Sequence, residues 1–310
     1  MVQLLLQHGA KLEVENENRS PLVGAIVSGN VNVVRELVQN GADVNSTSIE
    51  GFSSIAIASS FGCVDVLQEL PKHAPVLDNG MTPLFAASEG GNFDAVKLLL
   101  EQCTSVHVEG ELRSPLHGAS LHGQLDIVKL LLEHVADANC LDSDGWTALH
   151  MPAQNGHVGT IQELLQHDAP ITMLSKGWTP LCVASENGHL GVVKILLAYG
   201  ADHNIICKGD QTALCFAASK EFTDIVMELL RFGANANATN PVFGVTPIFL
   251  ASMNGHGNIT KERVQYGADI NAKKYNGQTP LHVAIKHGHI NVVNQILQSS
   301  NVNVNAASLV

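Results

Sequence analysis

The stretch TPLCVASENGHLGVVKILLAYGADHN, from Thr179 to Asn204, predicts a short helix, a turn and a longer amphipathic helix. Thr179 is a favoured helix N-cap, and Pro180 suits the first helical position because its missing N–H would be unpaired there anyway. The pair Asn187-Gly188 indicates a turn. Apolar residues then recur on one face of a second helix: Val192, Val193, Leu196 and Leu197. The stretch therefore predicts a unit of helix, turn, helix and extended loop.

The same pattern returns along the whole chain of 310 residues. Copies begin with Thr or Ser at positions 20, 53, 82, 114, 147, 179, 212, 246 and 279, which are 33, 29, 32, 33, 32, 33, 34 and 33 residues apart. Such a period indicates a stacked repeat array, because one unit cannot bury its apolar face alone. We expect one elongated domain, with a partial repeat over residues 1–19 (second helix and loop) and nine repeats over residues 20–310.

The slots of this unit carry a family resemblance. The pattern D-x-x-G-x-T-P-L-H-x-A…G-H…V-x-x-L-L…G-A-D-x-N resembles the ankyrin repeat, and it is matched by DSDGWTALH (142–150), GADVN (41–45), GADHN (200–204) and GADIN (267–271). The resemblance implies an all-α solenoid of stacked helix-turn-helix units with hairpin-like loops projecting from one edge. It also implies a non-catalytic scaffold or adaptor that holds another protein on its loop tips and first-helix surface, without a cofactor.

Composition limits the partners. The net charge of −12 argues against nucleic acid, whose binding depends on neutralising phosphates with Lys and Arg. No apolar run approaches the ~18 residues that a membrane span needs, and no signal peptide is evident at Met1, so we expect an intracellular, cytoplasmic protein. Residues 1–150 carry 7 basic and 19 acidic side chains, a balance of −12, whereas residues 151–310 carry 10 of each. The acidic half favours a basic partner segment docking on residues 1–150, or alternatively an acidic surface that only aids solubility.

The chemically reactive residue types occupy slots of the repeat. The third position after each start holds Val23, Ala56, Phe85, His117, His150, Cys182, Cys215, Phe249 and His282. A slot that accepts Val and Phe is packing space, so we expect no nucleophile there. Cys182 and Cys215 should lie ~10 Å apart, one helix-packing distance, which is beyond the reach of a disulfide. The six cysteines contain no C-x-x-C pair, which fits a reduced protein.

A second slot, after the turn between the helices, holds His157, His189, His256 and His289. Equivalent residues one repeat apart cannot converge on a zinc ion, whose ligand nitrogens lie ~2.1 Å from the metal. The phosphate loop, G-x-G-x-x-G, G-x-S-x-G and H-E-x-x-H motifs do not occur. We therefore expect no enzyme activity, no metal site and no small-molecule substrate.

The slot before each repeat start predicts the contact surface. Five consecutive copies hold residue types that are enriched at binding hot spots: Phe52, Met81, Arg113, Trp146 and Trp178. In ankyrin-like arrays this slot lies on the projecting loop. Three residues at the ends of the first helices would extend the surface: Phe61, Leu121 and His122. The alternative is that each Trp lies flat over a neighbouring loop and only shields helix ends.

Loop asparagines share one further slot: Asn45, Asn139, Asn204, Asn237 and Asn271. We expect their side chains to bond their own backbone and so to stabilise the turn. The resemblance adds that asparagines in this slot of ankyrin loops can be substrates of an intracellular asparaginyl hydroxylase.

Several repeats depart from the pattern. Pro71 predicts a truncated second helix and a bend, and Thr260 and Arg263 occupy slots that are apolar elsewhere. Pro152 and Glu221 replace a small helix former and a turn glycine. Neither end is capped by a polar repeat, which suggests an excerpt of a longer protein. An alternative function is therefore a targeting or regulatory segment of a ubiquitin-ligase substrate receptor, a channel or an enzyme.

Overall fold

The computed structural model describes residues 3–4, 8, 11–12, 20–44, 52–70, 82–102, 113–260 and 266–307. Met81, Pro71, Asn45 and Arg263 lie outside these ranges. The chain folds as two compact units. Unit 1 comprises residues 1–151 and 166–169, and unit 2 comprises residues 152–165 and 170–310.

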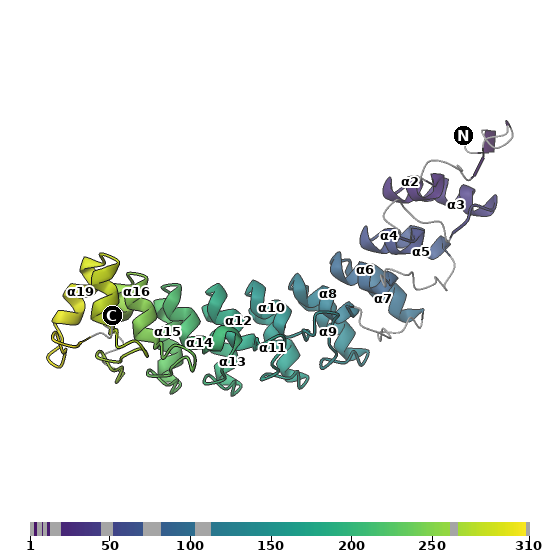
Figure 1. The fold of residues 1–310 in the computed structure, drawn as a ribbon. Coiled ribbons are helices and arrows are strands. Elements are labelled where there is room, and N and C mark those ends of the chain that lie inside the picture. The colour runs from purple at the N-terminus through teal and green to yellow at the C-terminus, as the bar shows by residue number, and fades with distance from the viewer. Residues whose placement is uncertain are drawn as a thin grey trace. The chain divides into compact units, whose positions relative to one another are not determined.

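The helices of unit 1 form four consecutive pairs: α2 (Pro21–Val27) with α3 (Val31–Gln39), α4 (Ser54–Ser60) with α5 (Val64–Glu69), α6 (Pro83–Glu89) with α7 (Phe93–Glu101), and α8 (Pro115–Leu121) with α9 (Leu125–Glu133). The first helices α2, α4, α6 and α8 contact one another in order, and the second helices α3, α5, α7 and α9 form a parallel row (Figure 1). Each pair is thus one repeat, stacked on the next.

Unit 2 repeats this arrangement with α12 (Pro180–Asn187) and α13 (Leu190–Ala198), α14 (Ala213–Ser219) and α15 (Thr223–Arg231), α16 (Pro247–Met253), and α18 (Pro280–Lys286) and α19 (Ile290–Leu297). Residues 257–260 are helical and continue the repeat that begins with α16. A short 3₁₀ turn, η1 (Lys208–Asp210), lies in one of the loops. Two further helices, α10 (His150–Asn155) and α11 (Val158–Gln166), hold residues of both units. The described part of the chain is all-α, as the sequence predicts (Figure 1).

Except at Thr147, the repeat starts are helix N-caps. The side-chain oxygen of Thr179 accepts the N–H of Cys182 at 3.2 Å, and Thr82 accepts that of Phe85 at 3.0 Å. Such a bond satisfies one of the unpaired N–H groups at a helix start and typically contributes ~1 kcal/mol. The predicted second-helix stripe is also confirmed in unit 2, where four side chains are at most 3% exposed: Val192, Val193, Leu196 and Leu197. Burying each one stabilises the unit by about 2 kcal/mol.

Two irregular helices have local causes. Helix α5 has six residues where most second helices have nine, which confirms the predicted truncation. Its C-cap Leu70 is extended, with ψ of 148°, because the residue before a proline is sterically kept out of the helical region. Helix α10 begins at His150 rather than directly after Thr147, and Pro152 falls in its first turn, where no N–H is needed.

Two other departures are accommodated locally. Thr260 is buried at 1% exposure, and its hydroxyl donates to the carbonyl of His256 at 3.2 Å. Glu221 takes the left-handed conformation of the glycine it replaces, with φ of 65°. No helix in the described ranges combines the length and the apolar character that crossing a membrane requires.

Candidate functional site

The predicted contact slot of unit 1 is organised around a buried carboxylate. Asp142, at 4% exposure, accepts the backbone N–H groups of Asp144 and Trp146, both at 2.9 Å. The guanidinium of Arg113, from the preceding repeat, lies 3.4 Å from Asp142 and 3.8 Å from Asp144. Two predicted contact residues, Arg113 and Trp146, therefore converge on one loop. The arrangement holds the loop in a fixed shape and leaves 39% of the Arg113 side chain exposed.

Trp146 also has partners on the helix side. Its ring lies 5.3 Å from that of His150 between centroids, at 53°. Its backbone carbonyl accepts a hydrogen bond from Nε2 of His117 at 3.0 Å. Trp146 is half-buried, and its contact with His150 places the ring against the start of α10.

Trp178 occupies the same slot in unit 2. Its ring lies 4.9 Å from that of Phe216 on α14, at 31°. Its backbone closes the loop against Ser175 with two hydrogen bonds of 2.8 Å. Like Trp146, it is half-buried. Both tryptophans thus combine a packing contact with intermediate burial, and their role in contacting a partner stays a prediction.

The remaining predicted contact residues differ in accessibility. Phe61, at the end of α4, is 60% exposed, and His122, which caps α8, is exposed. Phe52 and Leu121 are half-buried. Unit 1 therefore presents aromatic, aliphatic and imidazole side chains at the ends of first helices, within the ranges that the structure describes.

The histidines three residues after the repeat starts are structural. His117 is 1% exposed, its Nδ1 accepts the N–H of Ser114 at 3.3 Å, and Nε2 donates to Trp146 as above. Burial lowers the pKa of His117 below its ordinary value, and this effect outweighs the opposing effects of the Trp146 carbonyl and Asp142. Because Nδ1 must be unprotonated to accept, the neutral ring is the form that fits. His150 and His282 make the same Nδ1 bond to Thr147 and Thr279, each at 3.3 Å.

The histidines after the inter-helix turn tie neighbouring repeats together in unit 2. Nε2 of His189 lies 2.8 Å from the carbonyl of Gln154, and Nε2 of His289 lies 2.9 Å from that of Met253. Gly156 makes this possible, because a Cβ there would lie 2.6 Å from the His189 ring and its φ of 82° suits only glycine well. Within the described ranges, no group of three or more His, Cys, Asp or Glu side chains is placed to hold a metal ion.

Three of the loop asparagines, Asn204, Asn237 and Asn271, bond across repeats, which corrects for them the expectation that they bond their own backbone. Asn237 Nδ2 donates to the carbonyl of Gly267 at 2.9 Å, and its Oδ1 accepts the N–H of Asp269 at 2.7 Å. Asn271 makes the same two bonds to Asn301 and Asn303, both at 2.7 Å. Asn204 Oδ1 accepts the N–H of Asn235 at 3.0 Å.

The local turn in these loops is made by the residue two positions earlier. Asp137 and Asp202 accept the N–H groups of Asn139 and Asn204, both at 2.8 Å. Enzymatic modification of the asparagines stays a prediction, and at Asn237 or Asn271 it would require breaking two bonds between repeats.

The cysteines also require a correction. Cys182 on α12 and Cys207 in the following loop form a disulfide, with Cα atoms 6.8 Å apart. The expectation of reduced cysteines is therefore wrong for this pair, because it compared only equivalent slots, whereas these two residues occupy different slots of one repeat. Cys63, Cys140 and Cys215 are not part of a disulfide, and burial raises the pKa of the Cys63 and Cys140 thiols, which disfavours the nucleophilic thiolate.

One surface of unit 2 was missed at the sequence level. Val242, Phe243 and Tyr275 are 56%, 59% and 64% exposed, and they lie on loops of neighbouring repeats. The sequence does contain a signal for this surface. The spacing of 34 residues between Thr212 and Thr246 indicates one extra residue in the loop, and the loop sequence NPVFG contains two large apolar residues. The hot-spot slot alone does not find these residues, because they precede it by two or three positions.

A comparison with known proteins finds matches along nearly the whole chain. A family model described as ankyrin repeats in three copies covers residues 1–48, 55–142, 116–207 and 209–308. Ankyrin repeat protein L371 of Acanthamoeba polyphaga mimivirus is 22% identical over 299 residues, which is 93% of this chain and 31% of that protein. The E3 ubiquitin-protein ligase KEG of Arabidopsis thaliana is 27% identical over 313 residues, which is 96% of this chain and 16% of the relative. The chain thus spans less than a third of the length of either relative.

Proposed function

Since the chain belongs to the ankyrin-repeat family, we propose that it is a non-catalytic scaffold that holds another protein on its loop edge and first-helix surface. Ankyrin repeats are generally protein-binding modules, and the family match includes no catalytic domain. In unit 1 the proposed contact residues are Phe52, Phe61, Arg113, Leu121, His122 and Trp146, together with Met81 of the sequence. In unit 2 the proposed contact residue is Trp178.

The observation that carries this proposal is the accessibility of large side chains in the loop slot. Phe61 is 60% exposed, and Arg113, Trp146 and Trp178 keep part of their surface accessible although each has an internal partner. Such partly packed aromatic and Arg side chains lose little conformational freedom when a partner covers them. This combination favours a binding surface over a purely protective one.

We also propose that the partner segment on residues 1–150 is basic. The support is the balance of −12 in that half, which would speed the association of a basic segment at low ionic strength. Stopped-flow association should slow as NaCl rises from about 50 to about 500 mM, because the Debye length becomes about threefold shorter. A rate independent of salt would leave the acidic surface with a solubility role alone.

The test of the contact residues uses a partner captured from lysate by the purified chain. Replacing Trp146 and Trp178 together by Ala should weaken binding by ~2 kcal/mol, about thirtyfold in Kd. The matched control replaces Phe93 and Tyr199, which are 41% and 46% exposed and lie on second helices or their ends, by Ala. Titration calorimetry should show the loss for the tryptophan pair alone. Equal losses in both variants, or an unchanged Kd for the tryptophan variant in its folded fraction, contradict the proposal.

A second candidate is that the repeats serve as a targeting or regulatory segment of a larger protein. It is favoured by the length comparison, since the chain spans 31% and 16% of the two relatives above, one of which is named a ubiquitin ligase. A ubiquitin-ligase substrate receptor, a channel or an enzyme would then supply the working domain. The longest transcript that contains this sequence decides between a stand-alone scaffold and a segment.

The proposed location is intracellular and cytoplasmic. Three cysteines of the described ranges that form no disulfide support it, whereas the Cys182–Cys207 disulfide is more typical of an oxidising compartment. Labelling of thiols in fractionated cells tests the location and the state of the pair together.

A further inference from the structure

Three neighbouring loops of unit 2 form a continuous surface, which we call the loop platform: residues 206–211, 240–245 and 273–278. Four of its apolar side chains are more than half exposed: Ile206 at 53%, Val242 at 56%, Phe243 at 59% and Tyr275 at 64%. A large apolar side chain gains nothing from exposure, so a cluster of four on adjacent loops is typical of an interaction site.

The loop platform is held rigid from within. The buried Asn240 accepts the N–H groups of Val242 and Phe243, both at 2.8 Å, and its Nδ2 donates to the carbonyl of Gly209 in the preceding loop at 2.9 Å. These bonds fix the turn that presents Val242 and Phe243. They also join the first loop of the platform to the second.

The third loop is joined to the second in the same way. The N–H of Tyr275 donates to the carbonyl of Phe243 and its hydroxyl donates to the carbonyl of Pro241, both at 3.1 Å. Gly244 lies under the Tyr275 ring, where a Cβ would approach Cδ1 to 2.8 Å. Side chains on such a preorganised framework bind at a lower entropy cost than those on mobile loops.

The charge of the loop platform is opposite to that of the chain. It contains three lysines, Lys208, Lys273 and Lys274, and one acidic residue, Asp210, so its balance is +2, whereas the chain carries −12. Lys208 and Lys273 are exposed, and the ammonium of Lys274 lies 5.7 Å from the centroid of the Phe249 ring. Two carboxylates that lie a few residues before the loop platform in the sequence, Asp202 and Asp269, accept backbone N–H groups of their own turns.

We infer that the loop platform binds an acidic peptide segment that carries a bulky aliphatic or aromatic side chain. This inference rests on the proposed function, because both require a protein partner, and it names the chemistry of that partner on unit 2. The apolar residue would cover Phe243 and Tyr275, and the carboxylates would lie against Lys208 and Lys273. A balance of +2 is too small for nucleic acid, whose binding needs many neutralised phosphates.

The test begins with a random twelve-residue peptide library displayed on phage and selected on the full chain. The enriched peptides should combine Asp or Glu with a bulky apolar residue. Fluorescence anisotropy then gives the Kd of the most enriched synthetic peptide. Enrichment of neutral or basic peptides, or of none, overturns the inference.

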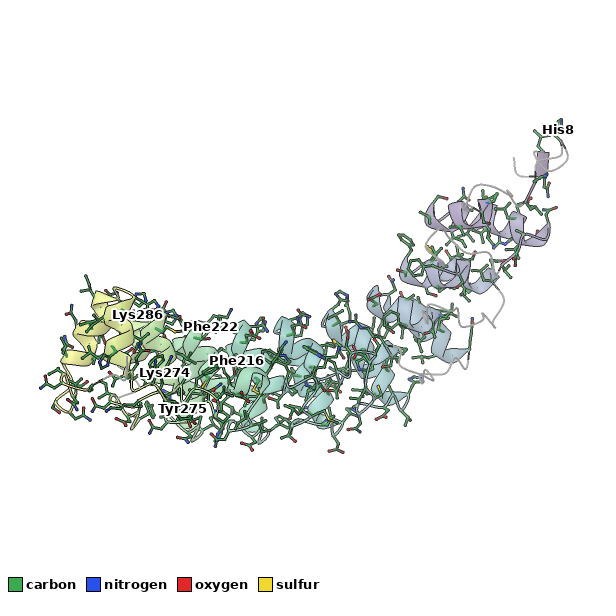
Figure 2. The ribbon with its side chains drawn as sticks, in the orientation of Figure 1. His8, Phe216, Phe222, Lys274, Tyr275 and Lys286 are labelled. Carbon is green, nitrogen blue, oxygen red and sulfur yellow. A yellow bond between two sulfur atoms is a disulfide. The ribbon has the colours of Figure 1, made fainter. Side chains whose placement is uncertain are left out.

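Variants locate the binding. Phe243→Ser should raise the Kd at least tenfold, and so should Lys208→Glu combined with Lys273→Glu. The matched control is Ile285→Ser combined with Lys286→Glu, since Ile285 is 61% exposed and Lys286 is exposed on α18, the helix that follows the Tyr275 loop. Figure 2 shows Lys286 and Tyr275 at opposite edges of unit 2. The control should stay within twofold of the parent, and circular dichroism confirms that each variant is folded.

Two further results separate this inference from the proposed function. If peptide binding is lost in the Trp146→Ala, Trp178→Ala variant but kept in the loop-platform variants, the proposed function stands and the inference fails. If neither set of variants changes the Kd, both fail. A second copy of the chain is the competing occupant, and light scattering that shows a dimer abolished by Phe243→Ser overturns the inference in its favour.

Discussion

Two loops occupy the same place in the repeat: residues 142–147 in unit 1 and 240–246 in unit 2. Each is held in shape by one buried side chain, which is a carboxylate in the first loop and an amide in the second. In each, a buried side chain accepts two backbone N–H groups ahead of it: Asp142 accepts those of Asp144 and Trp146, and Asn240 accepts those of Val242 and Phe243. In each, the same residue also contacts a group from the preceding repeat.

The second contact is where the loops differ. The Asp142 carboxylate needs a cation, and Arg113 supplies it at 3.4 Å. The Asn240 amide brings its own donor and bonds the carbonyl of Gly209 at 2.9 Å. The backbone architecture is therefore independent of charge, and each unit is free to place a different charge on its loop edge. Specificity in such an array lies in the loops, while the helices repeat.

The largest expected effect comes from removing the carboxylate. Asp142→Ala leaves the N–H groups of Asp144 and Trp146 without their acceptor and should lower the free energy of unfolding of unit 1 by about 3 kcal/mol. Urea titration followed by Trp146 fluorescence in a Trp178→Phe background measures it. Asp144→Ala is the matched control, since that side chain is 54% exposed, and it should cost under about 0.5 kcal/mol. Equal costs in the two variants would show that Asp142 does not organise the loop.

A smaller effect is expected from placing the carboxylate of unit 1 into unit 2. Asn240→Asp keeps the acceptor for Val242 and Phe243 but sets a carboxylate oxygen against the carbonyl of Gly209, which should cost about 2 kcal/mol. Trp178 fluorescence in a Trp146→Phe background reports it. Lowering the pH to about 4, near the usual pKa of Asp, should shrink the difference from the parent, because the protonated acid can donate to Gly209. A cost that does not depend on pH would indicate a packing defect instead.

Much of this fold follows from the sequence because its causes are local. Thr179 followed by Pro180 fixes a helix start, and the stripe from Val192 to Leu197 has one face to bury, so neither depends on distant residues. The shortened α5 followed from Pro71 for the same reason.

Contacts between different slots could not be read in this way. The disulfide joins Cys182 to Cys207, and Asn237 bonds Gly267 and Asp269 of the next loop. Periodic reasoning aligns each slot with itself, so it gives no distance between two different slots. The exposed Phe243 and Tyr275 were missed because their importance depends on two loops lying side by side.

Unit 1 should also lose stability in acid. The pKa of His117 is lowered in the folded protein, so the neutral ring stabilises unit 1 fully above the unfolded pKa near 6.5. This stabilisation is lost as the pH falls from 6.5 towards the lower folded pKa. The urea midpoint reported by Trp146 should therefore decrease between about pH 7.5 and about pH 5. The control is His117→Phe, since the equivalent slot holds Phe85 and Phe249 in other repeats. This variant should show a weaker dependence of the urea midpoint on pH, and an unchanged dependence would assign the effect to another group.

The smallest expected effect is the ion pair itself. Arg113 is 39% exposed and its Nε lies 3.4 Å from the Asp142 carboxylate, which is long for a charged hydrogen bond, so the pair should contribute less than its buried acceptor suggests. A double-mutant cycle of Arg113→Gln and Asp142→Asn should give a coupling energy of about 0.5–1 kcal/mol. The cycle cancels the general effect of changing the net charge of an acidic unit. A coupling energy of about 3 kcal/mol, the size expected for a buried pair, would mean that Arg113 holds the Asp142 carboxylate in place more than the two N–H groups do. The charged loop of unit 1 and the neutral Asn240 loop of unit 2 would then differ in the source of their stability as well as in their charge.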